Sequence, residues 1–148
     1  MGSPVLKELY IPYNPNVKHV SPSLLASMAQ LERVQMVHCE LTCPQVTTLC
    51  KAINGGKLPL KELDIRHNRP LEKHWDVDSN ILATAVNKLE KVHLVRISGE
   101  QLSKILSQSI VHTRLKYLYI EDYIGEVPRE LVKEASRHIK DLLSYLRD

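Results

Sequence analysis

A short apolar pattern that recurs along the chain constrains its fold more than any other feature. Residues 60–68 have the form L-x-x-L-x-L-x-x-N, and the apolar frame of this stretch occurs five times. The starts of the frames lie 25 to 29 residues apart, a period that predicts an array of stacked structural repeats. The frames are Leu6/Leu9/Ile11, Leu31/Val34/Met36, Leu60/Leu63/Ile65, Leu89/Val92/Leu94 and Leu115/Leu118/Ile120.

Each repeat is predicted to contain a short strand, a corner and a helix. Apolar residues alternate within each frame, so one strand face should point toward a core and the other toward solvent. The S/T-x-x-Q pattern of Thr42–Gln45 and Ser98–Gln101 predicts a capping box at the start of two helices. Gly55-Gly56 predicts the end of the first of them. Their apolar stripes are Val46, Leu49, Cys50 and Ile53, and Leu102, Ile105, Leu106 and Ile110.

Two segments depart from the repeat pattern. Residues 72–78 lengthen the third repeat and contain Trp75, the only tryptophan, so this segment is predicted to bulge at a rim. Its His74, Asp76 and Asp78 could hold a cation, although a solvated loop is the simpler interpretation. Near the C-terminus, apolar residues at helical spacing predict a helix of about five turns that caps the last repeat. They are Leu131, Ala135, Ile139, Leu142 and Leu146.

The chain is thereby predicted to divide into three parts. Residues 1–5 are interpreted as an expression remnant or linker, residues 6–127 as the repeat array and residues 128–148 as the capping helix. No comparable cap precedes the first frame, so we expect further repeats upstream in a longer protein. The first strand would then present an unpaired edge, which is a route to self-association.

Charged residues are expected to pair across neighbouring strands. If the strand positions are numbered L1-x2-x3-L4-x5-L6-x7-x8, equivalent positions of parallel strands form columns with a spacing of about 4.8 Å. Charge alternates along columns x2 and x3, which predicts weak ion pairs that set the register and leave little net charge. Column x2 holds Lys7, Glu32, Lys61, Glu90 and Lys116, and column x3 holds Glu8, Arg33, Glu62, Lys91 and Tyr117.

The remaining columns, x5, x7 and x8, carry the candidate binding residues, and column x7 also includes Val95. Their centre is basic and rich in histidine, with tyrosines toward both ends. Tyrosine and arginine often anchor protein interfaces, so a protein partner with an acidic contact surface is predicted on this concave face. A ligand on a rim or on the convex helices is the alternative. The candidates are Tyr10, Tyr13, His38, Arg66, His67, His93, Arg96 and Tyr119.

No catalytic or cofactor motif is found. The chain lacks a P-loop, G-x-S-x-G and H-E-x-x-H, so we expect neither an enzyme nor a cofactor. His38, His67 and His93 could lie on neighbouring strands, but no cysteine is placed to complete a tetrahedral metal site. A net charge of +3 is small for a nucleic-acid scaffold, which stays an alternative through the basic centre and its tyrosines.

The cysteines favour a reducing compartment. Their number is odd and no secretory signal is present, so we expect free thiols and a cytoplasmic protein. Cys39 takes the corner position that Asn68 holds in the pattern, and Cys50 lies on an apolar helix stripe. Cys43, near a helix start, is the one candidate for a reactive thiol. No apolar run is long enough to span a membrane.

The five frames with their helices resemble the leucine-rich repeat family over residues 6–127. The stretch Leu41–Ile53 looks closest to the ribonuclease-inhibitor-like subclass, and Val20–Val34 is similar to arrays of NOD-like immune receptors. The resemblance implies an α/β solenoid with five parallel strands on the concave side, helices on the convex side and a non-catalytic protein-binding role, innate-immune or apoptosis-related. Val127–Arg147 has a competing resemblance, to the segment that ends repeat arrays in Roco-type GTPases.

Overall fold

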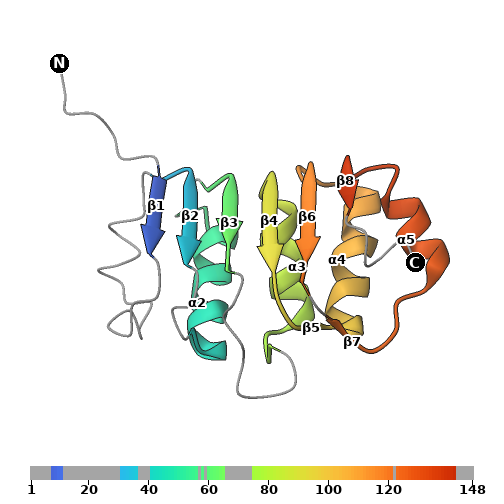
Figure 1. Ribbon diagram of the computed structural model, residues 1–148, viewed down its shortest axis with the longest axis horizontal. Coiled ribbons are helices and arrows are strands. Elements are labelled where there is room, and N and C mark those ends of the chain that lie inside the picture. Colours follow the sequence, from blue (N-terminus) through green and yellow to red (C-terminus); the bar gives the residue numbers. More distant parts are fainter. Residues whose placement is uncertain are drawn as a thin grey trace.

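The computed structural model describes the following residues of the protein: 8–11, 31–36, 41–56, 58, 60–65, 75–121 and 123–142. Strands and helices alternate through most of them (Figure 1). In chain order they are β1 (Glu8–Ile11), β2 (Arg33–Met36), α2 (Cys43–Asn54), β3 (Glu62–Asp64), α3 (Ser79–Asn87), β4 (Lys91–Leu94), β5 (Ile97–Ser98), α4 (Gly99–Val111), β6 (Tyr117–Ile120), β7 (Tyr123–Ile124), α5 (Arg129–Ala135) and β8 (Asp141–Leu142).

Six parallel strands form the main sheet, in the chain order β1-β2-β3-β4-β6-β8. The second apolar residue of each predicted frame aligns with that of the next. Leu9 pairs with Val34 and Val34 with Leu63. Leu63 in turn pairs with Val92, and Val92 with Leu118. The strands predicted from the five frames are therefore confirmed, in the predicted register.

One backbone hydrogen bond recurs where successive strands begin. The N–H of Lys61 donates to the carbonyl of Glu32, and the N–H of Glu90 donates to that of Lys61, both at 2.7 Å. Lys116 donates to Glu90 at 2.8 Å. Because equivalent backbone atoms bond at these three steps, the strand starts share one local geometry. At the last step the N–H of Asp141, one position later in the frame, donates to the carbonyl of Lys116 at 2.8 Å.

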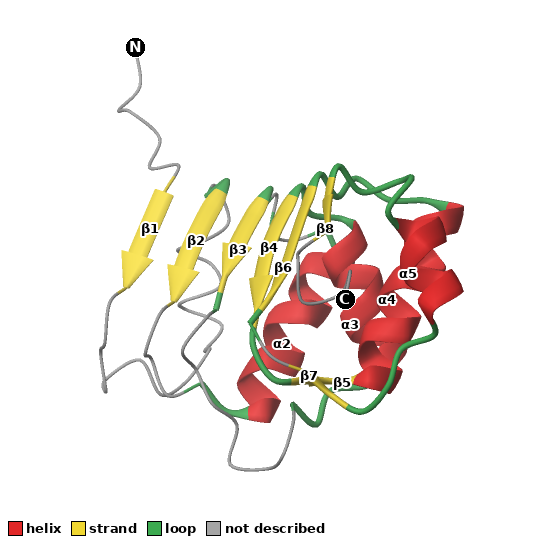
Figure 2. Cartoon of the chain, turned by 45° about the vertical axis from the view of Figure 1, so that its right-hand side comes forward, coloured by secondary structure: helices red, strands yellow, loops and turns green. Residues whose placement is uncertain are grey.

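The protein is a mixed α/β structure in which the described helices all lie on one face of the sheet (Figure 2). Along this layer α3 lies between α2 and α4, and α4 contacts α5. β5 and β7 pair in parallel as a second small sheet, beyond the ends of β4 and β6. The hydrophobic core lies between the sheet and the helices, and burial of its apolar side chains is the main stabilising contribution. Its members include Val92 and Leu118 from the sheet and Leu82, Leu102 and Ile105 from the helices.

The starts of α2 and α4 confirm the predicted capping boxes. Thr42 Oγ1 accepts the N–H of Gln45, while Gln45 Oε1 accepts the N–H of Thr42. Ser98 and Gln101 repeat this arrangement at α4. Gly56 follows the end of α2 with a φ of 73°, a conformation that glycine adopts more readily than any other residue. The predicted end of this helix is thus also confirmed.

The burial of Trp75 differs from the bulge at a rim that was predicted for its segment. Its side chain is only 1% exposed and belongs to the core. The indole N–H donates to the carbonyl of Val95 at 2.6 Å, and the backbone N–H of Trp75 donates to the carbonyl of Arg96. A tryptophan buries a large apolar area and needs a partner for its one N–H, and this location supplies both. The predicted rim position is therefore wrong for this residue.

The capping helix predicted over residues 128–148 is wrong as one continuous helix. α5 ends at Ala135, and after a turn the chain returns to the sheet as β8. β8 pairs in parallel with β6, while residues 143–148 lie outside the described part. Strand pairing gives backbone N–H and C=O groups of β6 hydrogen-bond partners that a helix over the last repeat would not supply.

β8 belongs to a sixth copy of the apolar frame. Leu142 aligns with Leu118, so Ile139 takes the first position of the frame. Both Ile139 and Leu142 are 1% exposed. In the sequence, Ser144 stands where the third apolar residue would be. The pattern is therefore incomplete, and its two apolar residues also match helical spacing.

Candidate functional site

The face of the main sheet opposite the helices carries no described element (Figure 2). Burial alternates along its strands: Val34 and Met36 of β2 are buried, whereas Arg33 and Gln35 are exposed. All-parallel sheets usually have both faces covered, so this face, over which no described residue packs as a second layer, is the first candidate for a binding surface. We call it the open face. Its described side chains are Arg33, Gln35, Glu62, Asp64, Lys91, His93, Tyr117, Tyr119 and Asp141.

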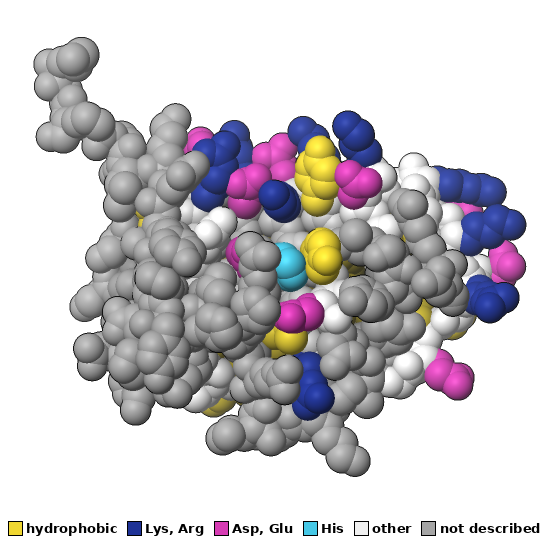
Figure 3. Space-filling model, viewed as in Figure 1, with side chains coloured by type: hydrophobic (Ala, Val, Ile, Leu, Met, Phe, Trp, Pro, Cys, Tyr) yellow, Lys and Arg dark blue, Asp and Glu magenta, His cyan; other side chains and the backbone are white. Residues whose placement is uncertain are grey.

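Charged side chains gather where the strands begin, along the upper edge of the view in Figure 3. The predicted columns form ion pairs there. Arg33 Nε lies 2.6 Å from Glu62 Oε2 across β2 and β3. One position earlier in the repeat, Lys116 Nζ lies 3.2 Å from Glu90 Oε1, and Lys61 pairs with Glu32 at 3.8 Å. These pairs are well exposed, so each contributes about 0–1 kcal/mol, and they leave little net charge on this edge.

Column x5 forms a second row, further along the strands. Asp64, His93 and Tyr119 are consecutive partners across β3, β4 and β6. The rings of His93 and Tyr119 stack with centroids 4.1 Å apart and planes at 27°. His93 Nδ1 lies 4.0 Å from Asp64 Oδ1, and both side chains are largely buried. Tyr119 is 39% exposed and is the most exposed of these three side chains.

The structure brings together two of the predicted site residues, His93 and Tyr119. Tyr10 lies on β1, in register with Gln35, and nothing further is described of its side chain. Tyr13, His38, Arg66 and His67 lie outside the described residues. The basic, histidine-rich centre therefore stays a prediction.

The corner after β4 contains the candidate residue Arg96 and the column residue Val95. Arg96 has a φ of 48°, a left-handed conformation that is uncommon for residues other than glycine. Val95, expected in the columns of the binding face, is 4% exposed. The strand alternation ends at Leu94, and the carbonyl of Val95 is held by the indole of Trp75. Val95 therefore belongs to the core, although its column was expected on the concave face.

Tyr117 is the open-face residue that sequence reasoning passed over. It is 38% exposed, almost as much as Tyr119, and it lies two positions earlier on β6. The signal was present, because Tyr117 interrupts the charge alternation of column x3. The two tyrosines point to the same side of one strand and together give the open face its exposed aromatic surface.

The two described cysteines, Cys43 and Cys50, lie in different environments. Burial raises the pKa of the Cys50 thiol to about 12, so this cysteine is a core residue, as predicted. Cys43 Sγ accepts the backbone N–H of Asp76 at 3.3 Å and is only partly exposed. Cys39 and His74 lie outside the described residues. Within the described ranges no group of histidine, cysteine and carboxylate side chains could hold a metal ion.

Comparisons with known proteins add no information about function, so the open face is the main source of it. No family model matches the chain, and no curated protein is significantly similar to it. In the described part of the chain, no helix is long and apolar enough to cross a membrane.

Proposed function

We propose that the protein is a leucine-rich repeat array that binds a protein partner without catalysis, as a recognition or regulatory part of a larger cytoplasmic protein. The likeness of Val20–Val34 and Leu41–Ile53 to arrays of NOD-like receptors makes an innate-immune role the more specific form of this proposal. The repeat domain of a Roco-type GTPase is the alternative.

One observation carries the proposal: equivalent residues of successive repeats align in a parallel sheet whose described helices all lie on one face. In repeat arrays, each unit contacts its neighbours and the uncovered strand face forms an extended binding surface. The frames, the aligned registers and the recurring hydrogen bond at the strand starts all support a repeated unit of this kind.

The composition of the open face supports a protein as the ligand. Tyr117 and Tyr119 are large, partly exposed and located on one strand, and tyrosine is enriched among residues that dominate binding energy. The ion pairs beside them are weak and exposed, which is typical of the polar rim of an interface. Arg66 and Arg96 are the arginines that the sequence predicts for contact with the acidic surface of the partner.

The proposal is tested by affinity capture from cytosolic extract, read by quantitative mass spectrometry. The wild type is compared with a Tyr117→Ala/Tyr119→Ala variant, and an Arg129→Ala/Lys133→Ala variant on α5 serves as a control on the helical side. A protein partner captured by the wild type and the control but lost with the tyrosine variant is the expected result. A partner retained by all three proteins contradicts recognition at the open face.

A further inference from the structure

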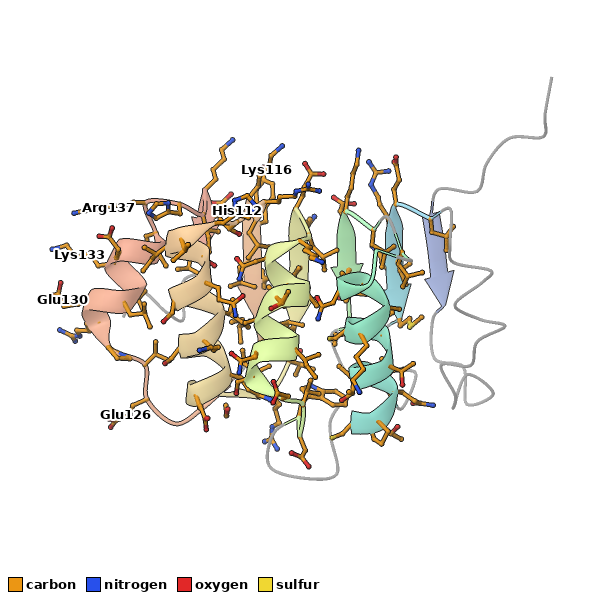
Figure 4. All side chains as sticks on the ribbon, turned by 180° about the vertical axis from the view of Figure 1, so that it is seen from behind. His112, Lys116, Glu126, Glu130, Lys133 and Arg137 are labelled. Carbon is orange, nitrogen blue, oxygen red and sulfur yellow. The ribbon has the colours of Figure 1, made fainter. Side chains whose placement is uncertain are left out.

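A broad groove lies on the helical side of the molecule, at the ends of α2, α3 and α4. Its volume is about 1390 Å³, and the starts of β3, β4 and β6 form its other wall. His112 and Lys116 mark this end of the molecule in Figure 4, where α4 ends and β6 begins. We call it the helix-end groove. It is lined by different residues from those of the open face, so a ligand bound in it does not depend on the proposed function.

The described lining of the helix-end groove is strongly basic. It contains five lysine or arginine side chains and one carboxylate, that of Glu90. Lys116 pairs with Glu90, and Lys61 pairs with Glu32 outside the groove. The other three cations are Lys88, Lys104 and Arg114. They are exposed and form no ion pair with any described residue.

A structural role accounts for one of these three cations. The carbonyl end of a helix carries partial negative charge, which attracts a cation within about the last turn. Lys88 follows this rule, because its Nζ donates to the carbonyl of Asn54 at the end of α2 with a distance of 2.7 Å. Lys104 lies near the middle of α4. Arg114 lies next to the end of α3, because its backbone N–H donates to the carbonyl of Asn87. Among the described residues neither side chain bonds a carbonyl at a helix end, so stabilisation of helix ends leaves both side chains unexplained.

The rest of the lining favours a peptide over a nucleic acid. Val111 is 86% exposed, the highest value among the large hydrophobic side chains of the described residues. Thr84, Ser107 and Gln108 add hydroxyl and amide groups beside it. The described lining contains no tryptophan, tyrosine or phenylalanine, and His112 supplies its one aromatic ring, whereas single-stranded nucleic acids are bound by stacking successive bases on several aromatic rings. A protein segment can use the apolar and the charged parts of such a surface together.

We propose that the helix-end groove binds an acidic peptide segment of a partner protein. Carboxylates of the segment contact Lys104 and Arg114, and an apolar side chain of the segment covers Val111. Charge complementarity of this kind steers association and is weakened by salt.

The test measures fluorescence anisotropy with a short labelled peptide in which glutamate alternates with leucine and serine. A matched peptide carries glutamine in place of glutamate, and an oligothymidylate of equal length is the nucleic-acid probe. The variant is Lys104→Glu/Arg114→Glu, and Arg129→Glu/Lys133→Glu is a control with the same change of charge on α5. Lys104→Gln/Arg114→Gln repeats the test without introducing acidic groups, and circular dichroism checks that each variant is folded.

The glutamate peptide is expected to bind the wild type and the α5 control, with affinity reduced about tenfold or more in Lys104→Glu/Arg114→Glu. The glutamine peptide is expected to bind the wild type weakly, with an affinity no higher than that of the glutamate peptide for Lys104→Glu/Arg114→Glu. Equal affinity for all variants, or no binding of the glutamate peptide to the wild type, overturns the proposal. Binding of oligothymidylate alone, dependent on Lys104 and Arg114, replaces the peptide with a nucleic acid and overturns it as well.

Discussion

The indole N–H of Trp75 donates a 2.6 Å hydrogen bond to the backbone carbonyl of Val95 in the buried core. Gln101 completes the connection, because its side-chain amide donates to the carbonyls of Trp75 and Val77 at 2.6 and 2.9 Å. The segment before α3, the corner after β4 and the start of α4 therefore share one buried hydrogen-bond network. Successive units of the fold are joined by specific polar contacts as well as by apolar burial.

Trp75→Phe is expected to lower the free energy of unfolding by about 1–3 kcal/mol, because it leaves the buried carbonyl of Val95 without its indole donor. Trp75→Ala adds a cavity and should cost about 3–5 kcal/mol. Urea unfolding followed by circular dichroism measures both. Val111→Ala, at a side chain that is 86% exposed, should stay within about 0.5 kcal/mol of the wild type. A Trp75→Phe variant as stable as this control would contradict the role assigned to the indole N–H.

The repeated strands could be predicted from the sequence because a strict local pattern dictates them. Positions such as Leu63 and Val92 recur at fixed places in each frame, and parallel pairing of equivalent residues then sets the register. The capping boxes were readable for the same reason, since Thr42 and Gln45 interact within one turn. Local interactions leave a signal in neighbouring residues, and this signal identifies the element without knowledge of its surroundings.

The errors arose where distant parts of the chain decide the outcome. Ile139 and Leu142 match both a helix stripe and a strand frame, and the unpaired edge of β6 selects the strand. Trp75 sits in a polar segment, and its burial depends on the carbonyl of Val95, which is remote in the sequence. Charged columns of the open face could be predicted, but the cations of the helix-end groove could not. Lys104 and Arg114 come from separate segments with no shared pattern.

Asn87 and Ser109 form a second buried polar contact, between α3 and α4. Ser109 Oγ donates to Asn87 Oδ1 at 2.7 Å, and both side chains are buried. Ser109→Ala removes this donor and should destabilise the protein by about 1–3 kcal/mol. Ser107→Ala, the same substitution at an exposed position of α4, is the control and should change stability by no more than about 0.5 kcal/mol. Urea unfolding compares the two.

A double-mutant cycle tests whether the contact itself is responsible. Asn87→Leu combined with Ser109→Ala removes both polar partners, so the double variant should be less destabilised than the sum of the single variants, by about 0.5–3 kcal/mol. Strict additivity would show that the two side chains do not interact energetically, despite their distance.

Leu142→Ala tests the sixth frame. Leu142 is 1% exposed and aligns with Leu118, so its truncation should lower the free energy of unfolding by about 2–5 kcal/mol. The N–H of Asp141, which donates to the carbonyl of Lys116, should exchange slowly with solvent in the wild type and faster in the variant. Lys140→Ala, at an exposed neighbouring position, is the control. Equal stability of the two variants would argue against a buried strand at this edge.

Cys50 makes the stability of the protein depend on alkaline pH. Burial raises the pKa of its thiol from the ordinary 9.0 to about 12, so between these values the unfolded chain loses a proton that the folded protein keeps. Stability therefore falls as pH rises through this window, and at about pH 10.5 the loss relative to about pH 8 should reach about 2 kcal/mol. Cys50→Ala lacks the titrating thiol, while all lysines, all tyrosines and the other cysteines are retained. Its unfolding free energy, measured by urea titration at both pH values, should decrease by about 2 kcal/mol less than that of the wild type. An identical pH dependence in the two proteins would mean that the thiol ionises without cost in the folded state, which contradicts its place in the core.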